Sequence, residues 1–265
     1  MFSELPGNGA LVVIYVISLA MLLAGIWIGH RLGAWRRRSL AGTEAGSTVT
    51  LQGSALALLG LMLGFTFAAA VSRFDTRKSI VLQEANAIGT ALLRTDFLPA
   101  PYDKQAADLL KQYLTQRVAA RGKNLGDLEI ERALHRSVEL HDQMWKIAVA
   151  ATKAEPLSRS VGLYTQSLND VIDLHTTRLA AARNHVPDSV IVMLFLLAMI
   201  SMGVVAFDSV VQNKRGSGAL VVTAILTAGV LAVVIDMDQP WLGFLVIDQA
   251  PLTDLLRSVG VPPKG

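Results

Sequence analysis

Two aspartates stand where carboxylates could bind ions beside a membrane. Asp236 and Asp238 follow the uncharged run 218–235 and precede Pro240. Carboxylates contributed by several subunits could form a ring that concentrates cations or binds calcium through oxygen ligands. The alternative is a solvated helix end with the turn chemistry of Asp before Pro. The sequence leaves both readings open, and it does not identify any metal.

Glu84 is a third carboxylate of interest because it shares a helical stripe with apolar residues such as Ile80, Ile88 and Ala91. Burying an unpaired carboxylate is costly. Glu84 therefore either pairs with a basic residue such as Arg77 or Lys78, or faces a water-filled path. We expect pairing.

The motifs of common enzymes are absent from the sequence. It has no cysteine, no phosphate-binding Gly-rich loop, no zinc helix and no nucleophile elbow. Its five histidines, at positions 30, 135, 141, 175 and 185, are scattered. His175 lies on an apolar seam, where we expect a hydrogen-bonded core histidine rather than a ligand. We expect a protein that is not an enzyme and needs no cofactor.

The elements that position these residues include four uncharged runs. The chain is 52% hydrophobic, and its 17% charged residues fall below the roughly 25% of soluble domains. Spans are predicted at about 9–29, 53–72, 189–207 and 218–235, each long enough for a bilayer core of ~30 Å. The net charge of +3 is too small to indicate nucleic-acid binding. We predict an all-α integral membrane protein with two transmembrane hairpins that flank a soluble helical bundle domain.

The boundaries follow from charge, proline and glycine. We expect a first hairpin in 1–72, a helical bundle in 73–186, a second hairpin in 187–236 and an interfacial carboxyl-terminal segment in 237–265. Span two lacks proline up to Pro99, so it can continue as one long helix into the bundle. Further helices are expected at about 102–121 and 128–152. The last bundle helix has a coiled-coil-like seam of Leu157, Val161, Tyr164, Leu168, Val171, His175 and Ala182.

Basic residues in the short loops predict the topology. Four arginines follow span one, and Lys214 and Arg215 lie between spans three and four. Both loops should be cytoplasmic, which places the amino terminus and the helical domain on the periplasmic side. Arg73, Arg77 and Lys78 at the outer end of span two oppose this assignment.

Span two carries two different stripes. Gly60 and Gly64 allow a second helix to approach closely, either within one subunit or between subunits. The other stripe is small and apolar, and it could line a narrow hydrophobic constriction or simply face lipid or core. Its members are Ser54, Leu58, Leu61, Phe65, Ala68 and Ser72.

Three blocks of sequence resemble the bestrophin-like domain family of bacterial membrane proteins. The first is the run from Leu58 to Asp75, the second is Glu84–Thr90, and the third extends from Asp236 to Leu255. Bestrophins are oligomeric anion channels with four spans, a helical domain and a pore lined by the second span. The resemblance implies a multi-pass protein of the bacterial inner membrane. A literal likeness would place the helical domain in the cytosol, contrary to the loop charges.

Two functions remain as hypotheses. The first is a homo-oligomeric, bestrophin-like ion channel or pore whose second span lines the path, with the lipid bilayer, ions and further copies of the chain as partners. The second is a non-conducting membrane sensor or scaffold whose helical domain binds a ligand or a protein.

Overall fold

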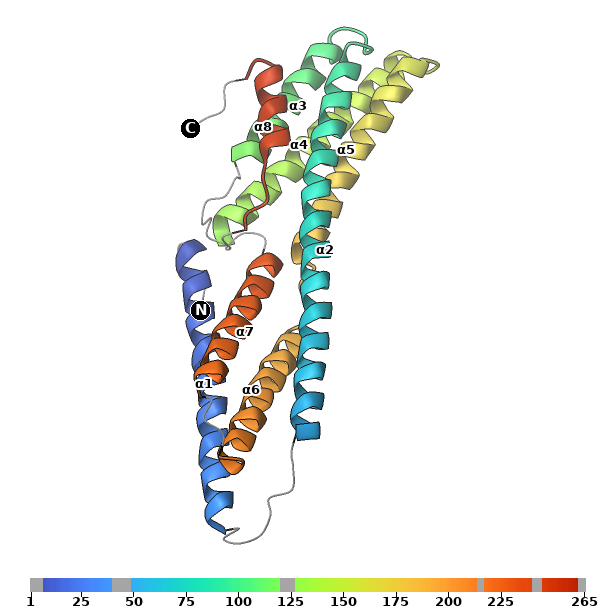
Figure 1. The fold of residues 1–265 in the computed structure, drawn as a ribbon. Helices are drawn as coiled ribbons and strands as arrows, with labels where there is room; N and C mark the ends of the chain where they lie inside the picture. Colours follow the sequence, from blue (N-terminus) through green and yellow to red (C-terminus); the bar gives the residue numbers. More distant parts are fainter. Residues whose placement is uncertain (1–6, 40–48, 120–126, 214–216, 240–244, 262–265) are drawn as a thin grey trace. The chain divides into compact units, whose positions relative to one another are not determined.

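Helices are the only regular secondary structure among the residues that the structure describes. The computed structural model describes residues 7–39, 49–119, 127–213, 217–239 and 245–261, in which there are eight helices and no strand (Figure 1). The all-α prediction is confirmed. The helices are α1 (Gly7–Ser39), α2 (Val49–Thr95), α3 (Tyr102–Ala119), α4 (Asp127–Ala154), α5 (Arg159–Arg183), α6 (Asp188–Val211), α7 (Ser217–Asp238) and α8 (Ala250–Ser258).

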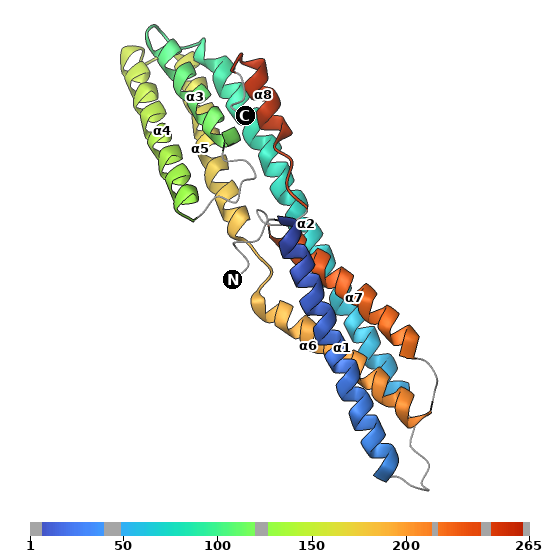
Figure 2. The ribbon, with the colours of Figure 1, turned by 90° about the vertical axis from the view of Figure 1, so that its left-hand side faces the viewer.

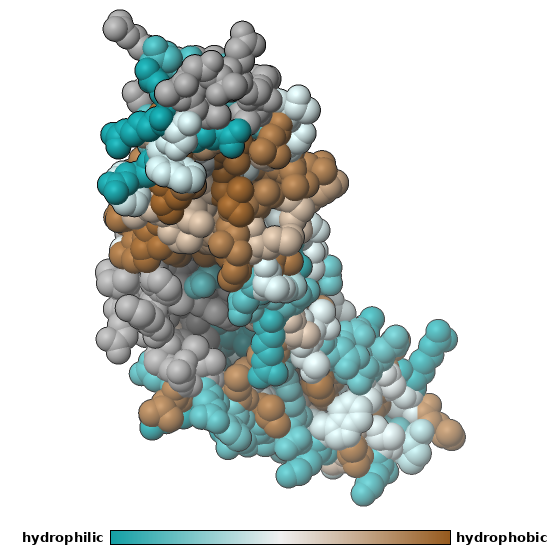
Figure 3. All heavy atoms as spheres, turned by 90° about the horizontal axis from the view of Figure 1, so that it is seen from below, coloured by the Kyte–Doolittle hydropathy of each residue, from teal (hydrophilic) through white to brown (hydrophobic). Residues whose placement is uncertain are grey.

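Four stretches are long and apolar enough to cross a bilayer, as predicted. They lie in Leu11–Ser39, Thr50–Thr95, Arg159–Val211 and Gly218–Asp238. Each overlaps one of the four uncharged runs. Many large apolar side chains of α1, α2, α6 and α7 are exposed, among them Val12, Trp27, Leu61, Val192 and Leu226. Figure 3, which views the molecule from below, shows hydrophobic residues gathered into a continuous region of the surface. Such a surface suits a lipid environment.

The chain divides into two compact units. The first comprises residues Met1–Arg73 and His185–Leu245, and the second comprises Phe74–Asn184 and Val246–Gly265. Helix α2 contributes its first part to the first unit and its second part to the other. No proline interrupts its 47 residues, and the continuous helix predicted from span two onward is present.

In the first unit, α1 packs against α6 and α7 (Figures 1 and 2). Its core contains Leu22 and Ile26 of α1, Leu59 of α2, and several residues of α6 and α7. The α2 segment is held on α6 partly by the Ser201 hydroxyl, which donates to the Ala55 carbonyl at 3.2 Å. The opposite side of the α2 segment is exposed among the residues that the structure describes.

Glycines set the closeness of α1 and α6. A Cβ at Gly29 would come within 2.1 Å of the Gly203 carbonyl oxygen, and one at Gly25 within 2.5 Å of the Met199 carbonyl oxygen. Gly33 continues the series, because a Cβ there would lie 2.9 Å from the Phe207 carbonyl oxygen. Since no side chain separates them, the two backbones touch, which is how small residues stabilise helix pairs in lipid.

The second unit is a helical bundle of the second part of α2 with α3, α4, α5 and α8. Its core includes Ile88 of α2, Leu110 of α3, Met144 of α4, Leu168 of α5 and Leu252 of α8. Helix α5 begins after Ser158, whose hydroxyl accepts from Val161 N at 3.4 Å. The seam predicted for this helix is buried from Val161 to His175.

The seam prediction was wrong at its first residue. Leu157 is 99% exposed because it precedes the Ser158 cap and lies outside the helix. Leu157 fits the spacing of the apolar residues, but the helix begins only after Ser158.

The carboxyl-terminal segment packs within the second unit. Ile247, Leu252 and Leu256 are buried in its core, and Leu255 lies against Gly89 of α2. Trp241, whose ring would anchor this segment at the membrane interface, lies outside the described residues. That the segment 237–265 lies at a membrane surface stays a prediction.

Candidate functional site

The stripe predicted on α2 forms an uncovered face of the first unit. Leu58, Leu61 and Phe65 are 49%, 55% and 65% exposed. Ser54, Ala68 and Ser72 are exposed as well. The residues on the other side of the helix, Leu59, Thr66 and Ala70, are buried. All six predicted residues therefore lie together on one face, and each of them is exposed.

Gly60 and Gly64 lie on the exposed surface beside this face. A Cβ added at either position would meet nothing within 4 Å. The close helix contact that the glycine pair predicts is therefore not made among the described residues of one chain. The alternative left open by the sequence, a contact with another subunit, stays a hypothesis.

Glu84 is the centre of a buried charge network in the second unit. Its side chain is fully buried. Its Oε1 accepts from Arg117 Nε at 2.7 Å, and its Oε2 accepts from Arg178 Nη1 and from Arg117 Nη2, the latter at 3.3 Å. Pairing was predicted correctly, but Arg77 and Lys78 were the wrong partners. Arg77 instead donates to the carbonyls of Ala181 and Asn184 at the end of α5.

Aromatic and imidazole rings extend the network. Tyr113 Oη donates to Glu84 Oε1 at 3.1 Å and lies 3.4 Å from His175 Nδ1. Because the single hydroxyl proton goes to Glu84, the Tyr113 oxygen accepts from His175 when Nδ1 carries the proton. The His141 ring lies 4.9 Å from the rings of both Tyr113 and His175. The expectation that His175 is a hydrogen-bonded core residue agrees with this geometry.

Burial and charge shift the pKa values of these groups. Burial acts to raise the pKa of Glu84, but the charges and hydrogen bonds of Arg117 and Arg178 outweigh it, and the pKa lies below its usual value. For His141, burial, with help from His175 and Arg117, lowers the pKa to about 4. For His175, burial and the nearby Arg117 lower the pKa to about 4. The network thus has an ionised carboxylate and two neutral imidazoles at neutral pH.

The network also holds the carboxyl-terminal segment. Arg178 Nη2 donates to Gln249 Oε1 at 2.7 Å, and Gln249 is the residue before α8. Glu84 on α2 is thereby connected to α8 through Arg178 of α5. No local signal in the sequence indicates Arg117 or Arg178 as partners, because both are distant from Glu84 along the chain.

Asp236 and Asp238 are buried rather than solvated, so the solvated-end reading is wrong. Both oxygens of Asp238 accept from Val186 N at 3.0 Å, and its carboxylate lies 3.5 Å from His185 Nδ1. Asp236 Oδ2 accepts from Leu245 N at 2.9 Å. The two carboxylates bind backbone amides of non-helical segments. Among the described residues, no group of three or more His, Cys, Asp or Glu side chains could hold a metal ion.

Comparison with known proteins places the chain in a family. A family model described as Bestrophin-like domain matches residues 15–252. The chain belongs to the Bestrophin-like domain family. No curated protein matches it.

Solved structures share the bestrophin-like fold. One variant of a bacterial bestrophin homologue from Klebsiella pneumoniae is 14% identical, with a TM-score of 0.66, and the match covers 95% of this chain and 94% of that one. Another variant of that homologue gives 14% identity and a TM-score of 0.66 over 94% and 97% of the two chains. A further structure, of a membrane protein variant, gives 14% identity and a TM-score of 0.65 over 94% and 97%. At this identity the likeness concerns the fold alone.

The glycines that pack α1 on α6 were missed by the sequence analysis. Gly25, Gly29 and Gly33 recur every four residues within the first uncharged run and its basic flank. Gly60 and Gly64 have the same four-residue spacing, with one step instead of two. The spacing alone could therefore have indicated a close helix contact at Gly25, Gly29 and Gly33.

Proposed function

We propose that this bestrophin-like chain forms a homo-oligomeric ion channel or pore in which the exposed face of α2 lines the path. The observation that carries the proposal is the exposure of six residues on one face of α2, while Leu59, Thr66 and Ala70 on another side of the helix are buried. The six are Ser54, Leu58, Leu61, Phe65, Ala68 and Ser72. A surface that one chain leaves bare can be covered when several copies assemble around an axis. Membership of the family and the likeness to bacterial bestrophin homologues support the same reading.

The largest side chain of this face sets the narrowest part of the proposed path. Phe65 is 65% exposed, and its neighbours on the stripe, Leu61 and Ala68, are also uncharged. Water leaves a narrow apolar neck readily, so a ring of phenylalanines would block hydrated ions until it widened. The serines at positions 54 and 72 would flank the neck on either side.

Gly60 and Gly64 supply a contact between subunits in this proposal. They are exposed, a Cβ at either would touch nothing in the described part of the chain, and they lie beside the proposed pore face. A neighbouring α2 could approach the backbone there at close range.

The membrane arrangement completes the proposal. Two hairpins, α1 with α2 and α6 with α7, cross the bacterial inner membrane, and the helical bundle lies outside the bilayer. The arginines after the first span and the Lys214–Arg215 pair favour cytoplasmic short loops, with the bundle in the periplasm. Asp236 and Asp238 anchor backbone rather than line the path.

Single-channel recording tests the proposal. Purified full-length protein should give discrete currents when it is reconstituted into planar bilayers. Protein that is incorporated and folded but stays silent across salts, pH values and voltages would contradict the channel. Silence of that kind would favour the sensor or scaffold instead.

A further inference from the structure

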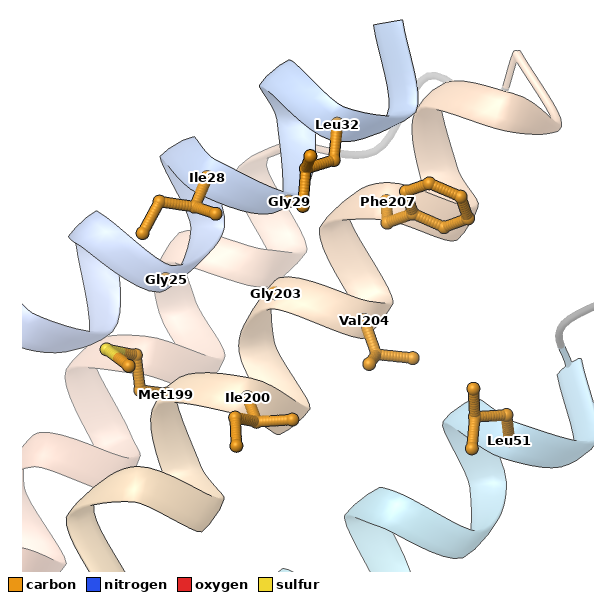
Figure 4. A pocket seen from close by; sticks show the side chains of 10 residues that line it. All are labelled: Gly25, Ile28, Gly29, Leu32, Leu51, Met199, Ile200, Gly203, Val204 and Phe207. Atoms are coloured by element: carbon orange, nitrogen blue, oxygen red, sulfur yellow. The ribbon is translucent and has the colours of Figure 1, made fainter. Parts of the chain in front are cut away.

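An apolar groove lies on the surface of the first unit, where α1, α6 and the start of α2 meet. Its volume is ≈ 260 Å³. Figure 4 shows Ile28 and Leu32 of α1 on one side, Val204 and Phe207 of α6 on another, and Leu51 of α2 opposite Val204. The side chains along its walls are hydrocarbon, apart from the thioether of Met199. The groove belongs to the stretch of chain that is apolar enough to span a bilayer, so lipid rather than water is its solvent.

Glycines create the hollow. Gly25, Gly29 and Gly203 line the groove, and they also bring α1 and α6 into backbone contact. Because these glycines have no side chains, the backbones of α1 and α6 form the floor of the groove. The side chains of Ile28 and Ile200 form its walls. The same residues that stabilise the helix pair therefore leave a narrow trough along it.

The groove leads toward an arginine. Gly25, Gly29, Leu32 and Arg36 follow steps of four, three and four along α1, so Arg36 lies one turn beyond Leu32 on the face that forms the groove. It is exposed and makes no hydrogen bond or ion pair with any residue that the structure describes. Arg36 follows the uncharged run, at the depth of the headgroups.

Two of the neighbouring basic residues, Arg37 and Arg31, are engaged in other contacts. Arg37 donates to Asn213 Oδ1 at 2.9 Å. The Arg31 guanidinium lies 5.0 Å from the centre of the Trp27 ring. Arg36 is thus the basic side chain that continues the groove and has its charge available for a ligand.

We infer that the groove binds one acyl chain of an anionic phospholipid, with the lipid phosphate at Arg36. An apolar trough that ends at a cation with no partner among the described residues matches the two parts of such a lipid. The size of the groove favours an acyl chain over a helix of a second copy. A helix lying along the eight residues from Gly25 to Leu32, at a diameter of ~10 Å, would need on the order of 900 Å³. It would lie over the walls and leave the floor empty. The inference does not require that the protein conducts ions.

Native mass spectrometry of the full-length protein in detergent tests the inference. The probes are phosphatidylglycerol and phosphatidylcholine with identical acyl chains. Wild-type protein should retain phosphatidylglycerol in preference to phosphatidylcholine. Arg36→Gln should lower that preference about fivefold, the effect of one basic residue near an anionic lipid. Arg38→Gln, whose position is about 200° around the helix, should leave it unchanged.

Filling the groove gives a second, independent test. Ile200→Trp places a large ring in the trough and should lower retained phosphatidylglycerol at least tenfold. Met193→Trp is the matched control, because Met193 lies two turns earlier on the same face, is 49% exposed and does not line the groove. Equal retention by Ile200→Trp and wild type would overturn the site. So would wild-type protein that retains both lipids equally. If Ile200→Trp changed the number of subunits without changing the amount of retained lipid, the groove would be assigned to a second copy. That result would also overturn the inference.

Discussion

The Glu84 carboxylate and the Arg117 guanidinium form an ion pair in the middle of the helical bundle, with 2.7 Å between Oε1 and Nε. The carboxylate is fully buried and the guanidinium nearly so. Arg178 approaches the same carboxylate from α5. One acidic residue of α2 therefore forms ion pairs with α3 and α5. Arg178 also donates to Gln249, which connects the pair to the segment before α8.

Removing this carboxylate should destabilise the protein strongly. Glu84→Gln leaves two buried guanidinium groups without a counter-charge, and we expect a loss of about 3–5 kcal/mol in the free energy of unfolding. Glu139→Gln is the control, because the Glu139–Arg136 pair is exposed and should contribute less than about 1 kcal/mol. Denaturant unfolding followed by circular dichroism measures both. Similar losses in the two variants would contradict the central role of Glu84.

The two buried imidazoles predict that stability falls in acid. Unfolded histidine binds a proton near pH 6.5, whereas His141 and His175 in the fold bind one only near pH 4. As the pH falls from about 6.5 to about 4, the unfolded chain takes up protons that the fold excludes. The free energy of unfolding should fall by on the order of 3 kcal/mol over this range.

A histidine variant separates this effect from general acid denaturation. His141→Phe should flatten the dependence of the melting temperature on pH between 6.5 and 4, because one of the two titrating groups is gone. His135→Gln is the control, since His135 is exposed. A wild-type slope in His141→Phe would show that His141 is not held neutral by the fold.

The two sets of glycines should respond differently to substitution. Gly29→Ala places a methyl group 2.1 Å from the Gly203 carbonyl oxygen, so α1 and α6 must separate and the melting temperature should fall. Gly60→Ala meets nothing within 4 Å in the described part of its own chain and should leave the monomer fold intact. If Gly60 lies between subunits, light scattering after size-exclusion chromatography will show weaker assembly of Gly60→Ala. Unchanged assembly would remove Gly60 from the subunit interface.

Labelling of single cysteines tests the topology. Because the chain has no cysteine of its own, Lys123→Cys and Thr43→Cys each introduce a unique thiol. An impermeant maleimide applied to intact spheroplasts should label position 123 and spare position 43, as the loop charges predict. The opposite pattern would place the helical bundle in the cytosol.

Helix positions were largely predictable because their signals are local. The uncharged runs, the proline-free stretch before Pro99 and the apolar seam of α5 each depend on neighbouring residues. The partners of Glu84 were not predictable in this way. Arg117 and Arg178 reach Glu84 from other helices, and the sequence alone does not specify which helix faces lie together. The backbone partners of Asp236 and Asp238 were not predictable for the same reason, since Leu245 and Val186 belong to irregular segments.

The most direct test of the proposed pore compares two phenylalanines on α2. Phe65 lies on the uncovered stripe, and Phe67 lies on the stripe of Gly60 and Gly64. The two positions are two residues apart and cannot share one helix face. In planar bilayers, Phe65→Ala should raise the basal conductance per assembled channel, because a smaller side chain lets water fill the neck. Phe67→Ala should lower the amount of assembled protein and leave the conductance of each channel close to wild type. Equal conductance changes in the two variants, after correction for assembled protein, would contradict a pore lined by this face of α2.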